Sequence, residues 1–464
     1  MLGITTTNAR VGGFRGGISA EAKTIYNRII ADGGVSNLTR LNFFVKGLKA
    51  IYGSLTNVPV CYDAHWIGYK LGSGTGATAG QAAAKLYSLT VAGDAVQSTA
   101  ASQPLLLSHN GVDNYYQGVG ITGNFCQSNT STYNTNDIDI EAKVYTNATT
   151  GDINFINISN GTSTTVDFFY SKSSNAIAFQ YYTGGFRSAF SVTTITDGDV
   201  FRVTRNSTTG AVVFKKNGTT ITTSGSQVAG ALDFSNTTIK IGQGLCKIYY
   251  ANFYISGVLN KSCNPAEYNA STSQTQWTSS TGEVWTINTG TATTGYKGCL
   301  VSRTLVQGDG VDDNMASGTL SISGAKTNYL AVNILRLTVA STQYLIDSKN
   351  ASENQVNLIY KDGLAVRMYT NTFVNFEPIT SNVLRLLTGL VNSTSSLTKI
   401  NNSNTATGTL SNKNITQLFL FSNQIGVTNG NAIINSYILS SVADTTIQQT
   451  ATYNLVKSLN ENAF

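Results

Sequence analysis

Charge and proline are both scarce in this chain. Of its 464 residues, 12% are charged and 4 are proline, whereas soluble domains average roughly 25% charged residues. Apolar residues still make up 41%, so the low charge does not indicate a solvated, disordered chain. The 30 basic residues are scattered along the sequence rather than clustered. This pattern argues against nucleic-acid binding, because proteins of that class usually carry a basic stripe.

Paired cysteines and long apolar runs are also missing. The cysteines are odd in number and none stands close to another: Cys61, Cys126, Cys246, Cys263 and Cys299. The sequence therefore predicts no disulfide framework and no metal-binding Cys-x-x-Cys pattern, and we expect buried free thiols in a protein made in a reducing cytoplasm. The first residues lack the apolar segment of a secretion signal. No run approaches the roughly 18 apolar residues of a membrane helix, so we expect no membrane insertion.

Short alternating segments dominate what is present. In residues 137–145, "DIDIEAKVY", every second residue is apolar, as it is in residues 176–182, "AIAFQYY". Glycine is frequent at 44, and an Asn217-Gly218 pair separates two such segments, which is the dipeptide that a tight hairpin turn favours. Many short strands joined by such turns are typical of an antiparallel β-sandwich.

The second half of the chain repeats the first. Residues 383–407 parallel residues 200–222, and we match Arg202 with Arg385 and Tyr254 with Tyr437. A Gly-Val-Asp segment occurs in both halves and ends in Asp113 and in Asp312. A fixed order of matching segments indicates duplication. The sequence therefore predicts a mainly β fold of two tandem antiparallel jelly-roll sandwiches, over residues 105–262 and 263–464, the second ending in a helix capped by Asp444.

Two helices are predicted before the sandwiches. Residues 1–57 would form a helical N-terminal region, and residues 58–104 a connector that includes a small-residue stretch. The second helix carries one apolar seam at spacings of three and four residues: Leu38, Leu41, Val45, Leu48 and Tyr52. Such a seam serves either a helical hairpin packed on its own domain or contact with copies and partners. We retain both interpretations.

The Gly-Val-Asp segments and the strands after them carry a resemblance to a known family. Residues 94–107 lead into "HNGVDNYY", residues 303–315 contain "GDGVDDNM", and a meander with an Asn-Gly-like turn follows each. This arrangement resembles the concanavalin A-like and laminin-G-like jelly-roll modules of bacteriophage virion proteins, over roughly residues 90–460. The chain departs from the family pattern at Asn114, where a second Asp is usual, and at Asn401-Asn402, where Asn-Gly is usual.

The resemblance implies a setting as well as a fold. It implies two packed antiparallel sheets per module and recognition of glycans or surfaces. It also implies that residues 1–57 anchor a homotrimeric fibre, spike or appendage to other virion proteins. We would then expect the protein on the virion, made in the host cytoplasm, and in contact with host surface glycan. A capsid decoration protein without a receptor role and a polysaccharide depolymerase are the alternatives.

Candidate chemistry is sparse. Asp137, Asp139 and Glu141 share one strand face, as paired carboxylates of glycosidases can, but the second copy has no acid there, and we favour an exposed polar face over a catalytic pair. His65 and His109 lack spacing for zinc or for a nucleophilic triad. Asp312 and Asp313 alone are too few oxygen ligands for calcium. We therefore assign no catalytic residue, no metal and no cofactor.

Glycan binding requires exposed aromatic faces beside hydrogen-bonding groups. Residues 180–187, "QYYTGGFR", place aromatic residues and an arginine around a Gly-Gly turn. We predict a carbohydrate-binding site formed by Tyr181, Tyr182 and Arg187, with the reservation that part of this cluster must face the core. The sequence thus favours a non-enzymatic attachment protein with two lectin-like domains.

Overall fold

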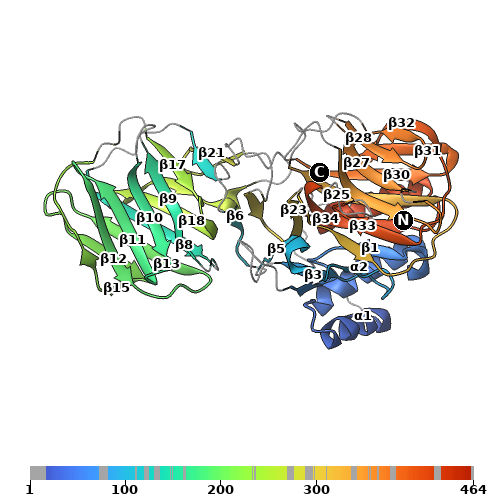
Figure 1. The fold of residues 1–464 in the computed structure, drawn as a ribbon, viewed down its shortest axis with the longest axis horizontal. Helices are drawn as coiled ribbons and strands as arrows, with labels where there is room; N and C mark the ends of the chain where they lie inside the picture. Colours follow the sequence, from blue (N-terminus) through green and yellow to red (C-terminus); the bar gives the residue numbers. More distant parts are fainter. Residues whose placement is uncertain are drawn as a thin grey trace.

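Two β-sandwiches form two lobes (Figure 1). The structure is a computed structural model. It describes residues 17–72, 82–109, 112–119, 125–129, 136–146, 148, 150–159, 164–232, 234, 237–268, 276–287, 296, 298–309, 311–335, 342–353, 355, 357–362, 365–376, 383–422 and 430–460. All strand pairs among these residues are antiparallel, so the predicted mainly β fold with short N-terminal helices is confirmed.

The first sandwich consists of two sheets. One sheet has the order β15 (Thr219–Ile221), β14 (Val212–Lys216), β13 (Asp199–Arg205), β8 (Ile138–Tyr145), β18 (Leu245–Ile255), β6 (Tyr115–Val119) and β22 (Cys299–Val301), with β19 (Val258–Cys263) also paired to β18. The other has the order β16 (Ser224–Gly225), β12 (Phe186–Val192), β11 (Ala176–Tyr182), β10 (Thr164–Ser171), β9 (Asp152–Ser159), β17 (Thr238–Ile241), β7 (Cys126–Ser128), β21 (Val284–Ile287) and β20 (Gln276–Thr278). Alternate residues of both sheets, such as Ile140 and Phe168, fill one core between them.

The second sandwich repeats this layout. One sheet has the order β32 (Ser403–Leu410), β31 (Ser393–Ile400), β30 (Leu384–Val391), β25 (Lys326–Ile334), β34 (Asn431–Ser440), β23 (Leu305–Asp309) and β5 (Leu105–Leu107), with β1 (Val60–Tyr62) also paired to β34. The other has the order β2 (Tyr69–Leu71), β3 (Ala83–Leu86), β4 (Ala95–Val96), β24 (Met315–Ser317), β33 (Gln417–Leu420), β26 (Gln343–Lys349), β27 (Leu358–Asp362), β28 (Ala365–Tyr369) and β29 (Phe373–Asn375). Its core includes Leu330, Met368 and Leu420.

The strand pairing corrects the predicted domain boundaries. Residues 58–104 are not a connector, because β1 pairs with β34 and β4 pairs with β24. β5, at the start of the predicted first sandwich, pairs with β23 of the second. In Figure 1 the blue N-terminal strands accordingly lie with the orange and red C-terminal ones. The first sandwich therefore spans β6 to β22, and the second is assembled from both sides of it.

The two sandwiches are register-equivalent, although not at the positions matched from the sequence. The Val200 N–H donates to Asn217 Oδ1 over 2.8 Å, and the Leu386 N–H donates to Asn401 Oδ1 over 3.0 Å. Both asparagines have φ of 49° and begin the same hairpin turn. Val200 thus corresponds to Leu386, so the counterpart of Arg202 in the second sandwich is Thr388. The match of Arg202 with Arg385 was wrong.

The Gly-Val-Asp segments are likewise not equivalent. Asp113 precedes β6, whereas Asp312 follows β23, although β6 and β23 occupy the same place in their sheets. The true counterparts are Gln117-Gly118 and Gln307-Gly308. A Cβ on Gly118 would lie 2.4 Å from the Gly242 carbonyl oxygen, and one on Gly308 would lie 2.5 Å from that of Gly430. Both strands therefore require glycine because a neighbouring backbone approaches closely.

Three helices cover the outer face of the β25–β34 sheet. They are α1 (Ala20–Ala31), α2 (Leu38–Tyr52) and α3 (Thr446–Leu459). Asn37 caps α2, and Thr445 caps α3 in place of the predicted Asp444. Asp444 is buried and accepts hydrogen bonds from the hydroxyls of Tyr52 and Tyr329. None of these helices has the length and apolar content needed to cross a membrane.

The apolar seam of α2 is buried inside the molecule. Leu41, Val45 and Leu48 have no exposed surface, Tyr52 is 6% exposed and Leu38 packs at the edge of the same cluster. Val456 and Leu459 of α3 belong to that cluster, together with residues of the sheet beneath. The seam therefore packs on its own domain and does not dock to copies or partners, because the side chains that would contact a partner are already buried.

All five cysteines are free and buried, as expected.

Candidate functional site

The predicted carbohydrate site divides between the two faces of the hairpin formed by β11 and β12. Tyr181 is 1% exposed and faces the core. Its hydroxyl accepts the Val228 N–H over 2.9 Å, and the Arg205 guanidinium lies 4.5 Å from its ring centre. Arg187 is the cross-strand partner of Tyr181 and is half-buried. Tyr181 cannot contact a ligand, so that part of the predicted site is wrong.

Tyr182 points the other way, into solvent. It is 47% exposed, and its cross-strand partner Phe186 is 59% exposed. Their ring centres lie 5.5 Å apart at an interplanar angle of 77°, an edge-to-face contact that aromatic pairs prefer. The two rings form the last pair before the turn, so an aromatic platform stands at the end of this hairpin.

The second sandwich carries the same hairpin end, which the sequence analysis missed. Tyr369 pairs with Phe373 as the last pair between β28 and β29, and Phe373 is 54% exposed. The sequence signal is "YTGGF" at 182–186 and "YTNTF" at 369–373. This signal lies at the turns, which the alternation of apolar residues along the strands does not reveal.

The two turns share their backbone geometry. The Thr183 N–H donates to the Gly185 carbonyl over 3.1 Å, and the Thr370 N–H donates to the Thr372 carbonyl over 3.0 Å. The next residue has positive φ in both cases, 69° at Gly184 and 79° at Asn371, where glycine and asparagine are the favoured residues. One turn design therefore holds both Tyr–Phe pairs.

The surroundings of the two pairs differ in charge. Beside Phe373, the Arg367 guanidinium lies 4.8 Å from the ring centre, ion-paired to Asp362 over 2.5 Å, and its Nε donates to Asn375. This is a cation stacked on an exposed ring. The hairpin of the first pair offers Gln180 and Ser188 on the same face instead. The two hairpin ends thus combine an aromatic platform with neutral polar groups in one case and with a guanidinium in the other.

A polar row crosses the sheet beside the first pair. Cross-strand neighbours place Ser188, Gln180, Asp167, Asn157 and Lys240 in one line over β12, β11, β10, β9 and β17. Asn157 Nδ2 donates to Asp167 Oδ1 over 2.6 Å. Burial raises the pKa of the Asp167 carboxyl. The row supplies amide, hydroxyl, carboxyl and ammonium groups within reach of one extended ligand.

The three candidate catalytic carboxylates are engaged elsewhere. Asp139 accepts two hydrogen bonds of 2.7 Å from Arg202, whose guanidinium also lies 4.8 Å from the Tyr254 ring centre. Glu141 accepts the Tyr250 hydroxyl over 3.2 Å, and Asp137 accepts the Ser207 N–H over 2.6 Å. These contacts fit an ordered polar face and leave no carboxylate pair poised around an open cleft.

The Asp309 loop gathers three carboxylates. Asp309, Asp312 and Asp313 place ligand oxygens within 4.8 Å of one another, which could attract a cation. Asp309 Oδ1, however, accepts the N–H groups of Val311 and Asp312, and Asp313 Oδ2 accepts the Asp309 N–H. Asp309 and Asp313 therefore hydrogen-bond the backbone of this turn. Asp113, in the first sandwich, pairs with Lys143 over 2.7 Å.

The two histidines meet in the contact between the lobes. Their ring centres lie 6.5 Å apart. His65 Nδ1 accepts the Thr304 N–H over 3.1 Å, so this nitrogen carries no proton. Burial and the nearby charges of Arg303 and Arg40 lower the pKa of His65 to about 2, and burial lowers that of His109 as well. Both therefore serve the junction between sandwiches as neutral side chains.

Comparison with known proteins finds likenesses only among solved structures. No protein-family model matches the chain, and no curated protein matches it. The mouse laminin alpha1 chain, domains LG4-5, aligns with 72% of this chain and 92% of its own at 10% identity and a TM-score of 0.29.

Two further solved structures show similar values. The binding domain of Botulinum Neurotoxin DC in complex with SialylT aligns with 34% of this chain and 40% of its own, at 14% identity and a TM-score of 0.25. The Trypanosoma rangeli sialidase in complex with sialic acid aligns with 61% of this chain and 51% of its own, at 8% identity and a TM-score of 0.29. This chain thus spans about half or less of these two proteins.

Proposed function

We propose that the protein binds glycans through the two aromatic hairpin ends, Tyr182–Phe186 and Tyr369–Phe373. The observation that carries this proposal is the repetition of a Tyr–Phe pair on the same turn in both sandwiches, in which Tyr182, Phe186 and Phe373 are exposed and Tyr369 is half-buried. Exposed aromatic rings normally cost solubility, and contiguous exposed apolar surface marks interaction sites. Repetition of the pair on sequences that otherwise diverged is explained by a shared binding task.

The chemistry of the surroundings suits sugars. A sugar ring offers an apolar face that can lie on an aromatic ring, and its hydroxyls need amide, hydroxyl or carboxylate partners at the rim. Gln180, Ser188 and Asp167 supply these groups beside the first pair. Arg367 supplies a guanidinium beside the second, and guanidinium groups match carboxylates. The first hairpin end should accept neutral sugars and the second should prefer acidic ones.

Two weak sites on one chain would act together. Linking two sites raises the apparent affinity for a surface carrying many ligands by as much as about 10²–10⁴, provided both can engage at once. Tyr182, Phe186 and Phe373 are exposed, and exposed sites of this kind give modest affinity singly. Multivalent contact with a glycan-coated surface is therefore the mode of binding that fits the geometry.

We further propose that this binding takes place on a phage virion, where the chain forms a fibre, spike or other appendage. The resemblance of the sequence to virion jelly-roll modules supports this setting. Attachment to other virion proteins and a homotrimeric state remain predictions of that resemblance. If the N-terminal region does attach the protein, it must use a surface other than the buried α2 seam.

A glycan array tests the binding proposal. The full chain, labelled and applied at several concentrations, should retain a defined subset of glycans. Tyr182→Ala/Phe186→Ala and Tyr369→Ala/Phe373→Ala should each weaken retention at least about tenfold, and the combined variant should abolish it. Ile447→Ala is a matched control, because Ile447 is 82% exposed on α3, which packs on the β25–β34 sheet and not on the sheet that carries β28 and β29. Undiminished retention by the combined variant would show that the aromatic pairs do not bind.

The alternatives predict other outcomes. A capsid decoration protein without a receptor role would retain no glycan in any form. A depolymerase would shorten the glycan rather than hold it. Electron microscopy of intact particles with an antibody against the chain would locate the protein, and the absence of label from virions would overturn the proposed setting.

A further inference from the structure

The second sandwich is completed by the far end of the chain. In the first sandwich, the four strands β19 to β22 follow the rest of the sandwich directly: β19 leaves β18 through a tight turn at Ser256-Gly257. In the second sandwich, the equivalent places are filled by β1 to β5 from the N-terminus. The closing strands of the second sandwich therefore precede the whole first sandwich in the sequence.

The equivalence holds residue by residue. β22 pairs with β6 through Cys299 and Gln117, and β5 pairs with β23 through Leu105 and Gln307. Gln117 and Gln307 are counterparts, as shown above. On the opposite sheet, β21 lies against β7 as β4 lies against β24. The two sandwiches are thus the same module, and the second has its closing strands at the other end of the chain.

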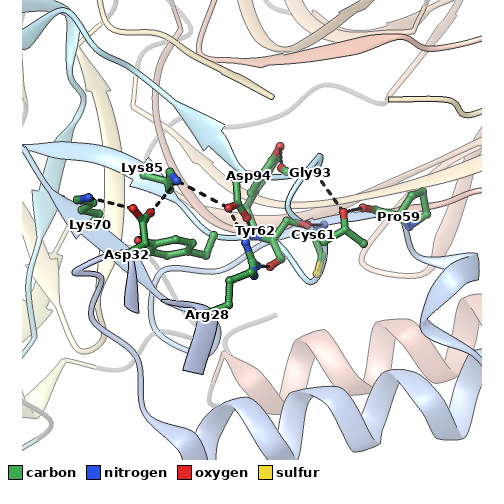
Figure 2. Close-up of polar contacts among 12 residues, drawn as sticks. Arg28, Asp32, Pro59, Cys61, Tyr62, Lys70, Lys85, Gly93 and Asp94 are labelled. Carbon is green, nitrogen blue, oxygen red and sulfur yellow. Dashed lines mark hydrogen bonds and ion pairs between the residues drawn. The ribbon is translucent and has the colours of Figure 1, made fainter. Parts of the chain in front are cut away.

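The N-terminal unit, residues 17–107 without 73–81, holds itself together. Figure 2 shows the polar contacts that tie α1 to the strands. Arg28 pairs with Asp94 over 2.6 Å, and Asp32 accepts Lys85 over 2.7 Å and the Tyr87 hydroxyl over 2.8 Å. Helices α1 and α2 and the closing strands are therefore one body, and residues 108–114 are the covalent link from it to the first sandwich.

The rest of the second sandwich, residues 302–460, is the acceptor of this unit. The contacts between unit and acceptor are extensive: β1 pairs with β34, Tyr62 stacks on Tyr437 at 6.1 Å, and Asp63 accepts two hydrogen bonds from Arg303. None of them depends on both partners belonging to one chain. An acceptor in a second copy would offer the same surface.

We propose that two copies of this chain associate by exchanging their N-terminal units, each unit closing the second sandwich of the other copy. Every contact within the closed sandwich is kept in the exchanged dimer, so the balance between the two forms is set by chain concentration and by the link 108–114. Synthesis favours exchange, because the unit is complete before its own acceptor, some 200 residues later in the chain, has been made. Meanwhile its unpaired strand edges can be taken by a neighbouring chain.

One cysteine substitution reports which chain donates the unit. Cys61 of β1 faces Ile438 of β34, and both lie in the same buried cluster. Directly opposite residues of an antiparallel pair are about 4.5–5.5 Å apart at Cα, a separation that a disulfide accepts. The Ile438→Cys variant is refolded under reducing conditions over a range of concentrations and is then oxidised. Dilute protein should form the disulfide to Cys61 within one chain, and concentrated protein should form a rising fraction of disulfide-linked dimer.

The first sandwich supplies a matched control. Asn252 and Ser262 occupy the register of Ile438 and Cys61, but a hairpin joins their strands. Asn252→Cys/Ser262→Cys should therefore crosslink within one chain at every concentration. Val60→Cys/Leu439→Cys is a second reporter on the next register position, should Ile438→Cys fold poorly. Crosslinks confined to single chains at all concentrations in both reporters, or absent from both, would overturn the proposal.

Discussion

Arg303 donates two hydrogen bonds, of 2.7 and 2.6 Å, to the carboxylate of Asp63. The two residues lie 240 positions apart, and both side chains are almost completely buried, at 5% and 0% exposure. Arg303 lies where the chain returns from the first sandwich to the second, and Asp63 follows β1. Arg303 also donates to the Leu459 carbonyl at the end of α3. One ion pair thus joins the N-terminal unit, the return of the chain and the C-terminal helix.

Breaking this pair should loosen the N-terminal unit. Asp63→Asn leaves a buried guanidinium uncompensated, and the loss of one partner of a buried pair costs about 3–5 kcal/mol. Denaturant unfolding should show this loss in the free energy of unfolding of the second sandwich. Lys49→Ala, which breaks a more exposed pair with Glu21, should cost far less, because solvent screens exposed ion pairs. Equal effects from the two variants would show that the Asp63–Arg303 pair carries no special weight.

Acidification should weaken the junction between the sandwiches through His65. Its folded-state pKa is lowered to about 2, whereas an unfolded chain has a pKa near 6.5. The unfolded chain therefore binds a proton that the folded chain does not, and stability falls as the pH drops below about 6.5. Groups facing His65 are Arg303, Arg40 and His109.

The measurement compares unfolding free energies at pH 7 and pH 5.5. Wild-type protein should lose about 1 kcal/mol more over this interval than His65→Gln, which has no proton to gain, since one fully unbalanced proton corresponds to about 1.4 kcal/mol per pH unit. A wild-type slope equal to that of His65→Gln would contradict the assignment of His65 as a buried neutral base.

The paired turns predict opposite effects of one substitution in each turn. Asn402 has φ of 67° in the position that Gly218 occupies in the first sandwich with φ of 82°. Asn402→Gly should therefore stabilise the second sandwich by several tenths of a kcal/mol, because Asn-Gly is the favoured pair for this turn. Gly218→Val should destabilise the first by more than about 1 kcal/mol. Thermal unfolding of the two variants decides the matter, and destabilisation by Asn402→Gly would refute the turn equivalence.

Carboxylate variants separate binding from cleavage. Because Asp139 is locked by Arg202 and Glu141 by Tyr250, we expect wild-type protein to release no reducing ends from a glycan that it binds. Asp139→Asn/Glu141→Gln should leave binding unchanged while lowering stability by about 1–3 kcal/mol through the lost pair. Release by the wild type that disappears in this variant would identify a depolymerase.

The alternation of apolar residues was enough to predict the sandwiches, because strands such as β8 bury every second residue. The Asn217 and Asn401 turns were also recognisable, since few residues accept positive φ. The closing strands β1 to β5 escaped prediction because they are two to four residues long, too short for a periodic pattern, and because β1, β4 and β5 pair with the distant strands β34, β24 and β23. Such pairing is decided by tertiary contacts that no local signal records.

The candidate site was predictable only in part. Residues 180–187 were recognised as an aromatic cluster, but Tyr181 and Tyr182 point to opposite faces of one strand, and which of the two is exposed depends on register. Arg187 is directly opposite Tyr181 on the neighbouring strand and therefore lies on the same face of the sheet as Tyr181. The second pair, Tyr369–Phe373, was visible in the sequence as a repeated turn motif and would have been found by comparing turns as well as strands.

The number of bound glycans per chain tests the central claim most directly. A monovalent oligosaccharide taken from the array should titrate into the full chain by calorimetry at two sites, or at two sites of different affinity if the second prefers acidic sugars. Tyr182→Ala/Phe186→Ala and Tyr369→Ala/Phe373→Ala should each remove one site and leave the thermal midpoint nearly unchanged. Two sites that survive in both variants, or in the combined variant, would contradict the account.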